Sequence, residues 1–249
     1  VADGTPYQLV FGPDEDTAGE LWGWAEAYTN GTVSSIVSTE PMRPLIDHGV
    51  LPELHKAELY AHFAAVFDRD VATCEALAQR AHQRGTELVD LTRVAPLLAR
   101  GDIERACDVF VGAPNASILD SDGNLIIADV FSSIEDVELV AAMLSRNTLR
   151  DFLIVEALDH PQSAGAVLLT VARNFGGAIR ANALCLWAMV AVSLGLNGWA
   201  IAALMTAQEE VHGHSLSLLL ANVMGIGQGH ALLELCRRGC EETWDGLAT

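Results

Sequence analysis

The stretch Arg180–Gln228, RANALCLWAMVAVSLGLNGWAIAALMTAQEEVHGHSLSLLLANVMGIGQ, decides the fold of this chain. Small residues recur in it at one-turn spacing on both sides of a break at Asn197–Gly198. Small side chains let two helix axes approach closely, and a break of a few residues forces an antiparallel pair. The placement of Gly195, Ala200 and Ala207 is typical of a tetratricopeptide-like repeat, of which one copy is clear. The stretch therefore predicts C-terminal antiparallel helix pairs of that kind.

The composition predicts a packed globular protein. Of the 249 residues, 51% are apolar and 19% charged, and a chain of this length buries roughly three quarters of its unfolded surface. The most apolar run, Ala183–Leu196, is too short to cross a bilayer at about 1.5 Å per residue, so we interpret it as a buried core helix. The sequence shows no basic stretch followed by an apolar run and a small-residue cleavage site, so it does not predict a signal peptide.

The charge limits the kinds of partner that the protein can bind, and the cysteines indicate the redox state of its compartment. The chain has 14 basic and 33 acidic residues, a formal net charge of −19. A surface so negative repels phosphate backbones and anionic membranes, so we expect neither nucleic acid nor membrane as a partner. The cysteines are odd in number and scattered, which favours reduced thiols in a cytoplasmic protein over a disulfide framework. They are Cys74, Cys107, Cys185, Cys236 and Cys240.

The first 36 residues differ in pattern from the rest. Tyr7–Phe11 alternates like a strand, and Leu21–Tyr28 is a second candidate strand. Asn30–Gly31 is a strong hairpin signal before Val33–Val37. The sequence therefore predicts a small N-terminal antiparallel sheet. With the helical pattern that begins at Glu40, the fold class is mainly α with this sheet, an α+β protein.

The helical pattern predicts element starts and three regions. Asp70 and Asp102 are candidate caps of two helices, and Ser132–Glu135 is a capping box that opens a third. Further helices are predicted at about 148–158, 162–174, 178–195, 198–212, 215–225 and 230–243. We expect a small α+β region at 1–67, a helical middle region at 68–147, and a helical-repeat-like region at 148–249.

Short motifs across most of the chain resemble one known family. In the C-terminal half they are Leu149–Phe152, Arg180–Ala183, Asn197–Ala200, Ala203–Ala207 and Ser215–Leu220. Upstream they are Gly31–Val33, Ser38–Pro41, His48–Leu51 and Glu58–Leu59. Together they are similar to an actinobacterial family known only as domain of unknown function 4192. The resemblance implies an uncharacterised helical protein and carries over no catalytic residue.

The beginning of the chain departs from that family's pattern. Members begin with an apolar Leu-Leu-Gly-Phe-x-Pro step, which this sequence lacks, and the chain begins at Val1 without Met. Leu196 stands where the family has a small residue, and the usual Pro after the second repeat helix is missing. We therefore expect a processed or partial product, or an alternative start codon.

His212-Gly-His214 is the strongest candidate for metal chemistry. Imidazole and carboxylate together suit zinc or another transition metal, and Glu209 or His230 could supply a third ligand. The alternative is a helix C-terminus, where histidine faces the last carbonyls and Gly213 ends the helix. We favour this alternative because only two ligands are local, and we expect no metal and no cofactor.

Three weaker motifs have ordinary structural interpretations. Asp120–Asn124 begins like a calcium loop but lacks its glycine and final glutamate, which favours a turn. Gly225–Gly229 is glycine-rich but follows a helix, and no Lys-Ser/Thr comes next, so it is a poor phosphate loop. Cys236 and Cys240 form one Cys-x-x-x-Cys pair without a second pair, which is a weak metal or redox signal. No Gly-x-Ser-x-Gly step indicates a serine nucleophile.

Two functions remain open. The first is a non-enzymatic interaction or scaffold module that binds a protein partner or a second copy of the chain. Its contact residues would be Leu232, Leu235 and Trp244, at the end of the helical array. The second is a metal-dependent hydrolytic enzyme that uses His212 and His214 with a distant carboxylate. We favour the first because the second lacks a complete set of catalytic groups.

Overall fold

The computed structural model describes residues 5–8, 30–33, 60–66, 70–114 and 126–247. The chain divides into two compact units, Val1–Pro52 and Glu53–Thr249. In the first unit, strands β1 (Thr5–Gln8) and β2 (Asn30–Val33) pair antiparallel, with Thr5 opposite Val33 and Gln8 opposite Asn30.

The predicted α+β class is wrong, and the fold is a helical bundle. Helices make up 84% of the described part of Glu53–Thr249, and that part contains no strand. The β1–β2 pair is only four residues long on each side and forms no layer of the fold. Asn30–Gly31 lies inside β2 rather than in a turn, because it pairs with residues from the start of the chain. The predicted strand at Leu21–Tyr28 lies outside the described residues.

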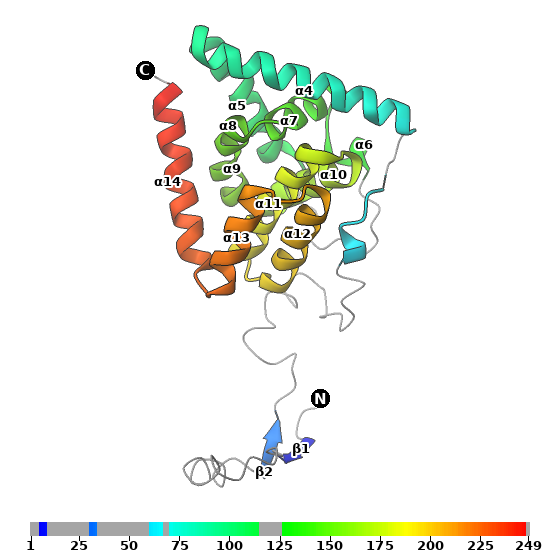
Figure 1. The fold of residues 1–249 in the computed structure, drawn as a ribbon, viewed down its shortest axis with the longest axis vertical. Coiled ribbons are helices and arrows are strands. Elements are labelled where there is room, and N and C mark those ends of the chain that lie inside the picture. The colour runs from blue at the N-terminus through cyan, green and yellow to red at the C-terminus, as the bar shows by residue number, and fades with distance from the viewer. Residues whose placement is uncertain (1–4, 9–29, 34–59, 67–69, 115–125, 248–249) are drawn as a thin grey trace. The chain divides into compact units, whose positions relative to one another are not determined.

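The second unit is built from successive helices (Figure 1). These are α4 (Val71–Val94), α5 (Pro96–Gly112), α6 (Ile127–Val130), α7 (Ile134–Leu144), α8 (Asn147–Arg150), a 3-10 turn (Asp151–Leu153), α9 (Ile154–Asp159), α10 (Pro161–Asn174), α11 (Gly177–Ser193), α12 (Asn197–Glu210), α13 (Ser215–Gly225) and α14 (Gly229–Leu247). Figure 1 shows α11 in the middle of this unit, with α4 across one end and α14 along one side.

Helix α11 is the centre of the core. All of its residues from Ile179 to Val192 are buried, and it packs against α7, α9, α10, α12, α13 and α14. In a repeat array each unit contacts only its sequence neighbours. The tetratricopeptide-like architecture is therefore wrong, because one helix buried on all sides organises a single bundle.

The helix pair that suggested a repeat does form. Helices α11 and α12 are joined by three residues, of which Gly195 has a φ of 77° that favours glycine. Ala200 and Ala207 on α12 are fully buried, as small residues at a close helix contact should be. The boundaries of the predicted regions at residues 67 and 147 stay a prediction.

Local capping explains where several helices begin. Asp70 caps α4 as predicted, because its Oδ1 accepts from the Thr73 backbone nitrogen at 2.9 Å. Ser133, one residue later than expected, caps α7 and accepts from the Asp136 nitrogen at 3.1 Å. The predicted cap at Asp102 is wrong. Helix α5 begins at Pro96. Proline suits the first turn because it has no backbone N–H, and the N–H groups of the first turn have no partner within the helix. Asp120–Asn124 lies outside the described residues.

Candidate functional site

Residues from three family-like motifs meet in one buried polar network. It consists of Arg150 on α8, Asp151 after it, Asn182 on α11, and His214 and Ser217 at the start of α13. Arg150, Asn182 and Ser217 are 6%, 1% and 0% exposed. The network therefore joins three elements that are far apart in the sequence.

Arg150 is fully engaged within the protein. Its Nη1 donates to Asn182 Oδ1 at 2.7 Å and to Asn147 Oδ1 at 3.3 Å. Its Nε and Nη2 donate to Asp151 Oδ1 at 2.9 and 2.6 Å. A buried guanidinium is stable only when it is paired and hydrogen-bonded in this way, so Arg150 is a structural cation.

His214 caps α13 through its side chain. Its Nδ1 accepts from the Ser217 backbone nitrogen at 3.3 Å, and its Nε2 lies 3.2 Å from Asn182 Oδ1. Asn182 Nδ2 donates to the Leu144 carbonyl at 2.8 Å, which orients the amide so that its oxygen faces the histidine. The hydrogen-bond network therefore assigns the proton to Nε2 and makes the ring neutral. Burial, and next the charge of Arg150, lower the pKa of His214.

Cys185, His214 and Asn182 lie in the order of a Cys-His-Asn catalytic triad. Cys185 Sγ lies 3.7 Å from His214 Nδ1, and Asn182 contacts the other side of the imidazole. A reactive cysteine is a thiolate with partial access to solvent. Cys185 is instead 0% exposed, and burial raises its pKa to about 12. The arrangement is therefore part of the core.

Two further arginines hold the segment 60–66 against the bundle. Arg173 Nε and Nη2 donate to the His62 carbonyl at 3.1 and 2.8 Å, and Arg180 Nη2 donates to the Phe63 carbonyl at 2.6 Å. The buried Phe63 ring packs edge-on against Trp187 with centroids 4.8 Å apart. Arg180, a motif residue, thus stabilises a long-range contact of the fold.

The residues predicted as metal candidates do not converge. His212 and Glu209 are exposed, whereas His214 points into the buried polar network. His230 lies on a different helix, α14. In the part of the chain that the structure describes, no three His, Cys, Asp or Glu side chains form a group that could hold a metal ion.

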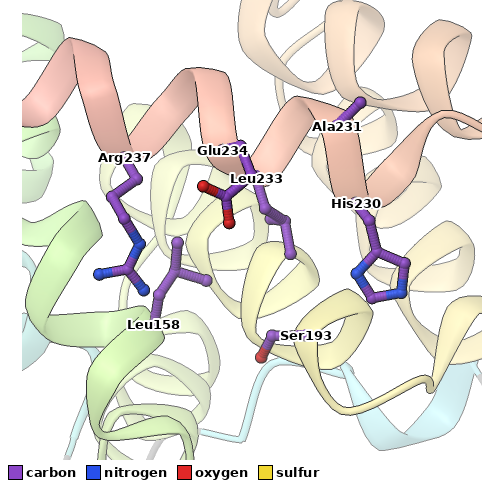
Figure 2. A pocket seen from close by; sticks show the side chains of 7 residues that line it. All are labelled: Leu158, Ser193, His230, Ala231, Leu233, Glu234 and Arg237. Carbon is purple, nitrogen blue, oxygen red and sulfur yellow. The ribbon is translucent and has the colours of Figure 1, made fainter.

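A surface pocket of about 340 Å³ lies where α14 passes the ends of α9 and α11 (Figure 2). Its lining residues are Leu158, Ser193, His230, Ala231, Leu233, Glu234 and Arg237. Arg237 Nη1 pairs with Asp159 Oδ1 at 2.8 Å, and His230 and Glu234 are exposed. The pocket was missed by the sequence analysis, although His230, Glu234 and Arg237 are spaced to share one face of a helix. Its charged groups are paired or solvated and do not form a catalytic set.

The three predicted contact residues have different environments. Leu232 is 7% exposed and belongs to the core, whereas Leu235 is 58% exposed. Trp244 packs edge-on against Phe152 with centroids 5.0 Å apart, and the Arg100 guanidinium lies 5.7 Å from its ring centroid. Trp244 therefore has one side on the core and lies next to α5.

Among the described residues, three strongly exposed apolar side chains lie close together at the turn between α4 and α5. Val94, Leu97 and Leu98 are 77%, 82% and 70% exposed. Arg100 is one turn beyond Leu97 on α5, and its guanidinium lies over the Trp244 ring of α14. We call Val94, Leu97, Leu98 and Trp244 the corner patch. The sequence analysis missed its first three members because they continue the apolar pattern of the helices. Pro96 is the one local signal of a turn.

The protein is a helical bundle around a buried central helix, and the buried motif residues Arg150, Arg180, Asn182 and Ser217 stabilise its core. The chain belongs to the family described as Domain of unknown function (DUF4192), whose model matches residues 1–229. This confirms the family resemblance. No curated protein and no solved structure matches the chain. Among the described residues, no helix is both long and apolar enough to span a membrane.

Proposed function

We propose that this protein is a non-enzymatic interaction module that binds another protein through the corner patch. The observation that carries the proposal is the exposure of Val94, Leu97 and Leu98, which are each at least 70% exposed within five residues. Single exposed apolar residues are common, whereas contiguous exposed apolar patches are typical of interaction sites. Trp244 extends the patch with an aromatic side chain of the type enriched at binding hot spots.

The polar groups support the same conclusion. Arg150, Asn182 and His214 bond to one another. Both His214 ring nitrogens are engaged within the protein, so no observation favours the metal-dependent hydrolase. The net charge of −19 opposes nucleic acid as the partner. The five cysteines are free thiols, which supports action in a reducing compartment such as the cytoplasm.

Site-specific photo-crosslinking in the native cell tests the proposal. A photoreactive phenylalanine analogue replaces Leu97 in one variant and Gln79, which is exposed on the same helix as Val94, in a control. Position 79 precedes Val94 by about 22 Å along α4 at 1.5 Å per residue. We expect a discrete heavier adduct from position 97 that is absent from position 79. Equal labelling at both positions, or no adduct from position 97, would show that the corner patch is not an interface.

A further inference from the structure

We infer that the partner segment that occupies the corner patch is a basic amphipathic helix. This inference rests on the proposed function and adds the chemistry of the partner to it. It is drawn from the size of the apolar surface and from the charges at its edge.

The apolar part of the patch fits the face of a short helix. It consists of Val94, Leu97 and Leu98 from one turn and of the half-buried Trp244 on α14, whose ring lies under the Arg100 guanidinium of α5. An amphipathic helix presents apolar side chains at positions i, i+3, i+4 and i+7, which cover such a surface in about two turns. Leu97 and Leu98 would lie between those side chains.

The edge of the patch is mostly acidic. On α14, Glu241 lies one turn before Trp244, and Asp245 follows it; both are exposed. On α4, the exposed Asp90 lies one turn before Val94. These carboxylates favour lysine or arginine on the flanks of a bound segment, because opposite charges at the edge of an interface accelerate association and exclude wrong partners.

Two cations also lie near the patch, and one of them is neutralised. Arg100 Nε pairs with Glu104 Oε1 at 2.7 Å, while its guanidinium lies over the Trp244 ring. Arg93 is exposed beside Val94. The summed charge at the edge of the corner patch is therefore negative, as is the net charge of −19 for the chain.

The same charges oppose a second copy of the chain as the occupant. A two-fold contact through the corner patch would bring the acidic edges of two copies together. Like charges across an interface lower affinity, so self-association through this surface is disfavoured. A partner with apolar and basic residues matches both the apolar surface of the patch and its acidic edge.

Peptide binding to the full chain tests the inference. The probe is a labelled peptide of about 14 leucines and lysines in amphipathic order, roughly four helical turns. One control peptide has glutamate in place of lysine, and another has the same leucines and lysines in an order without an apolar face. We expect the first peptide to bind at least about tenfold more tightly than either control, and its affinity to fall with added salt. Equal binding of the glutamate peptide would overturn the inference.

Paired variants localise the binding. L97S/L98S removes the two leucines of the patch, while L218S/L219S removes two leucines of α13 that are 45% and 52% exposed. We expect L97S/L98S to lower the affinity for the leucine–lysine peptide by at least about tenfold and L218S/L219S to leave this affinity unchanged. Unchanged binding to L97S/L98S would overturn the inference. Both pairs are exposed, so thermal melting of each variant should match the parent protein.

Failure of the inference and failure of the proposed function give different results. If the adduct from position 97 forms and an excess of the leucine–lysine peptide does not reduce it, the surface is an interface for a partner of other chemistry. If sedimentation shows a dimer that L97S/L98S converts to a monomer, the occupant is a second copy. Either result overturns the inference and leaves the patch as an interface, whereas absence of the adduct removes the proposed function.

Discussion

Asn182 is the residue on which the buried polar network depends. Its Oδ1 accepts from Arg150 Nη1 at 2.7 Å and faces His214 Nε2 at 3.2 Å, while its Nδ2 donates to the Leu144 carbonyl at 2.8 Å. An apolar residue of similar size removes all three bonds and leaves the Leu144 carbonyl and His214 Nε2 without this partner, while Arg150 keeps its bonds to Asn147 and Asp151. Such orphaned groups cost more than the hydrogen bonds themselves contribute.

We predict that N182L lowers the free energy of unfolding by at least about 1–3 kcal/mol, the usual penalty for one orphaned buried polar group. Urea titration followed by circular dichroism measures the change. The matched control is N222A on α13, where the asparagine is exposed, and this variant should stay within about 0.5 kcal/mol of the parent. Equal stability of N182L and the parent would mean that the network does not stabilise the fold.

His214 makes stability depend on pH. Burial and the charge of Arg150 lower its pKa below the ordinary 6.5, so the unfolded chain takes up the proton first as the pH falls. The free energy of unfolding should therefore decrease as the pH drops below 6.5 toward the folded-state pKa. Carboxylates begin to titrate at about pH 5, so the window lies above that value.

The measurement is chemical unfolding of the parent and H214N between about pH 5 and 6.5. Asparagine can still cap α13 but does not titrate, so we expect a smaller loss of stability in H214N. Burial and Arg146 also lower the pKa of His82, which accounts for part of the dependence that remains. Identical pH profiles of the two proteins would contradict this role of His214.

At the scale of elements, two glycines inside helices have opposite surroundings. A Cβ on Gly85 of α4 would meet Ser145 Oγ and would lie 2.7 Å from the Ala142 carbonyl oxygen. A Cβ on Gly101 of α5 would meet nothing within 4 Å. Gly85 therefore allows α4 and α7 to approach closely, whereas Gly101 is only a poor helix former.

We predict that G85A destabilises the protein by about 1–3 kcal/mol through overpacking, because the backbone carbonyl of Ala142 has to move. G101A should instead stabilise it by about 0.5–1 kcal/mol, since alanine is the better residue in a helix interior. Melting curves of the two variants in the same buffer give the comparison. Unchanged or raised stability of G85A would show that the α4–α7 packing differs from that described.

The sequence predicted elements better than their arrangement. The capping signal at Asp70 and the breaks at Asn197 and Ser215 are local, and helices α4, α12 and α13 begin there. The predicted helix start at Asp102 was wrong because the same apolar pattern already begins at Pro96, where α5 starts. Asn30–Gly31 failed because strand pairing with distant residues replaced the local turn.

At the scale of the molecule, the contacts that define the bundle lie within one unit. The buried polar network and the arginines that hold the segment 60–66 all belong to Glu53–Thr249. We predict that the fragment 53–249 unfolds cooperatively, with a melting midpoint within a few degrees of the full chain. Circular dichroism melts of both proteins provide the test. A fragment that melts without a cooperative transition would show that residues 1–52 are needed for the core.

The sequence by itself determined the family, the helical character of the C-terminal half and the close pair of α11 and α12. These follow from short-range patterns of small and apolar residues, which periodicity reveals. Only the tertiary structure decided that Arg150, Asn182 and His214 form one network, because they are separated by 32 residues at each step and no local pattern relates them. It also decided that Leu232 is buried and Leu97 is exposed. Both are apolar residues of amphipathic helices, and only the packing of neighbouring helices distinguishes core from surface.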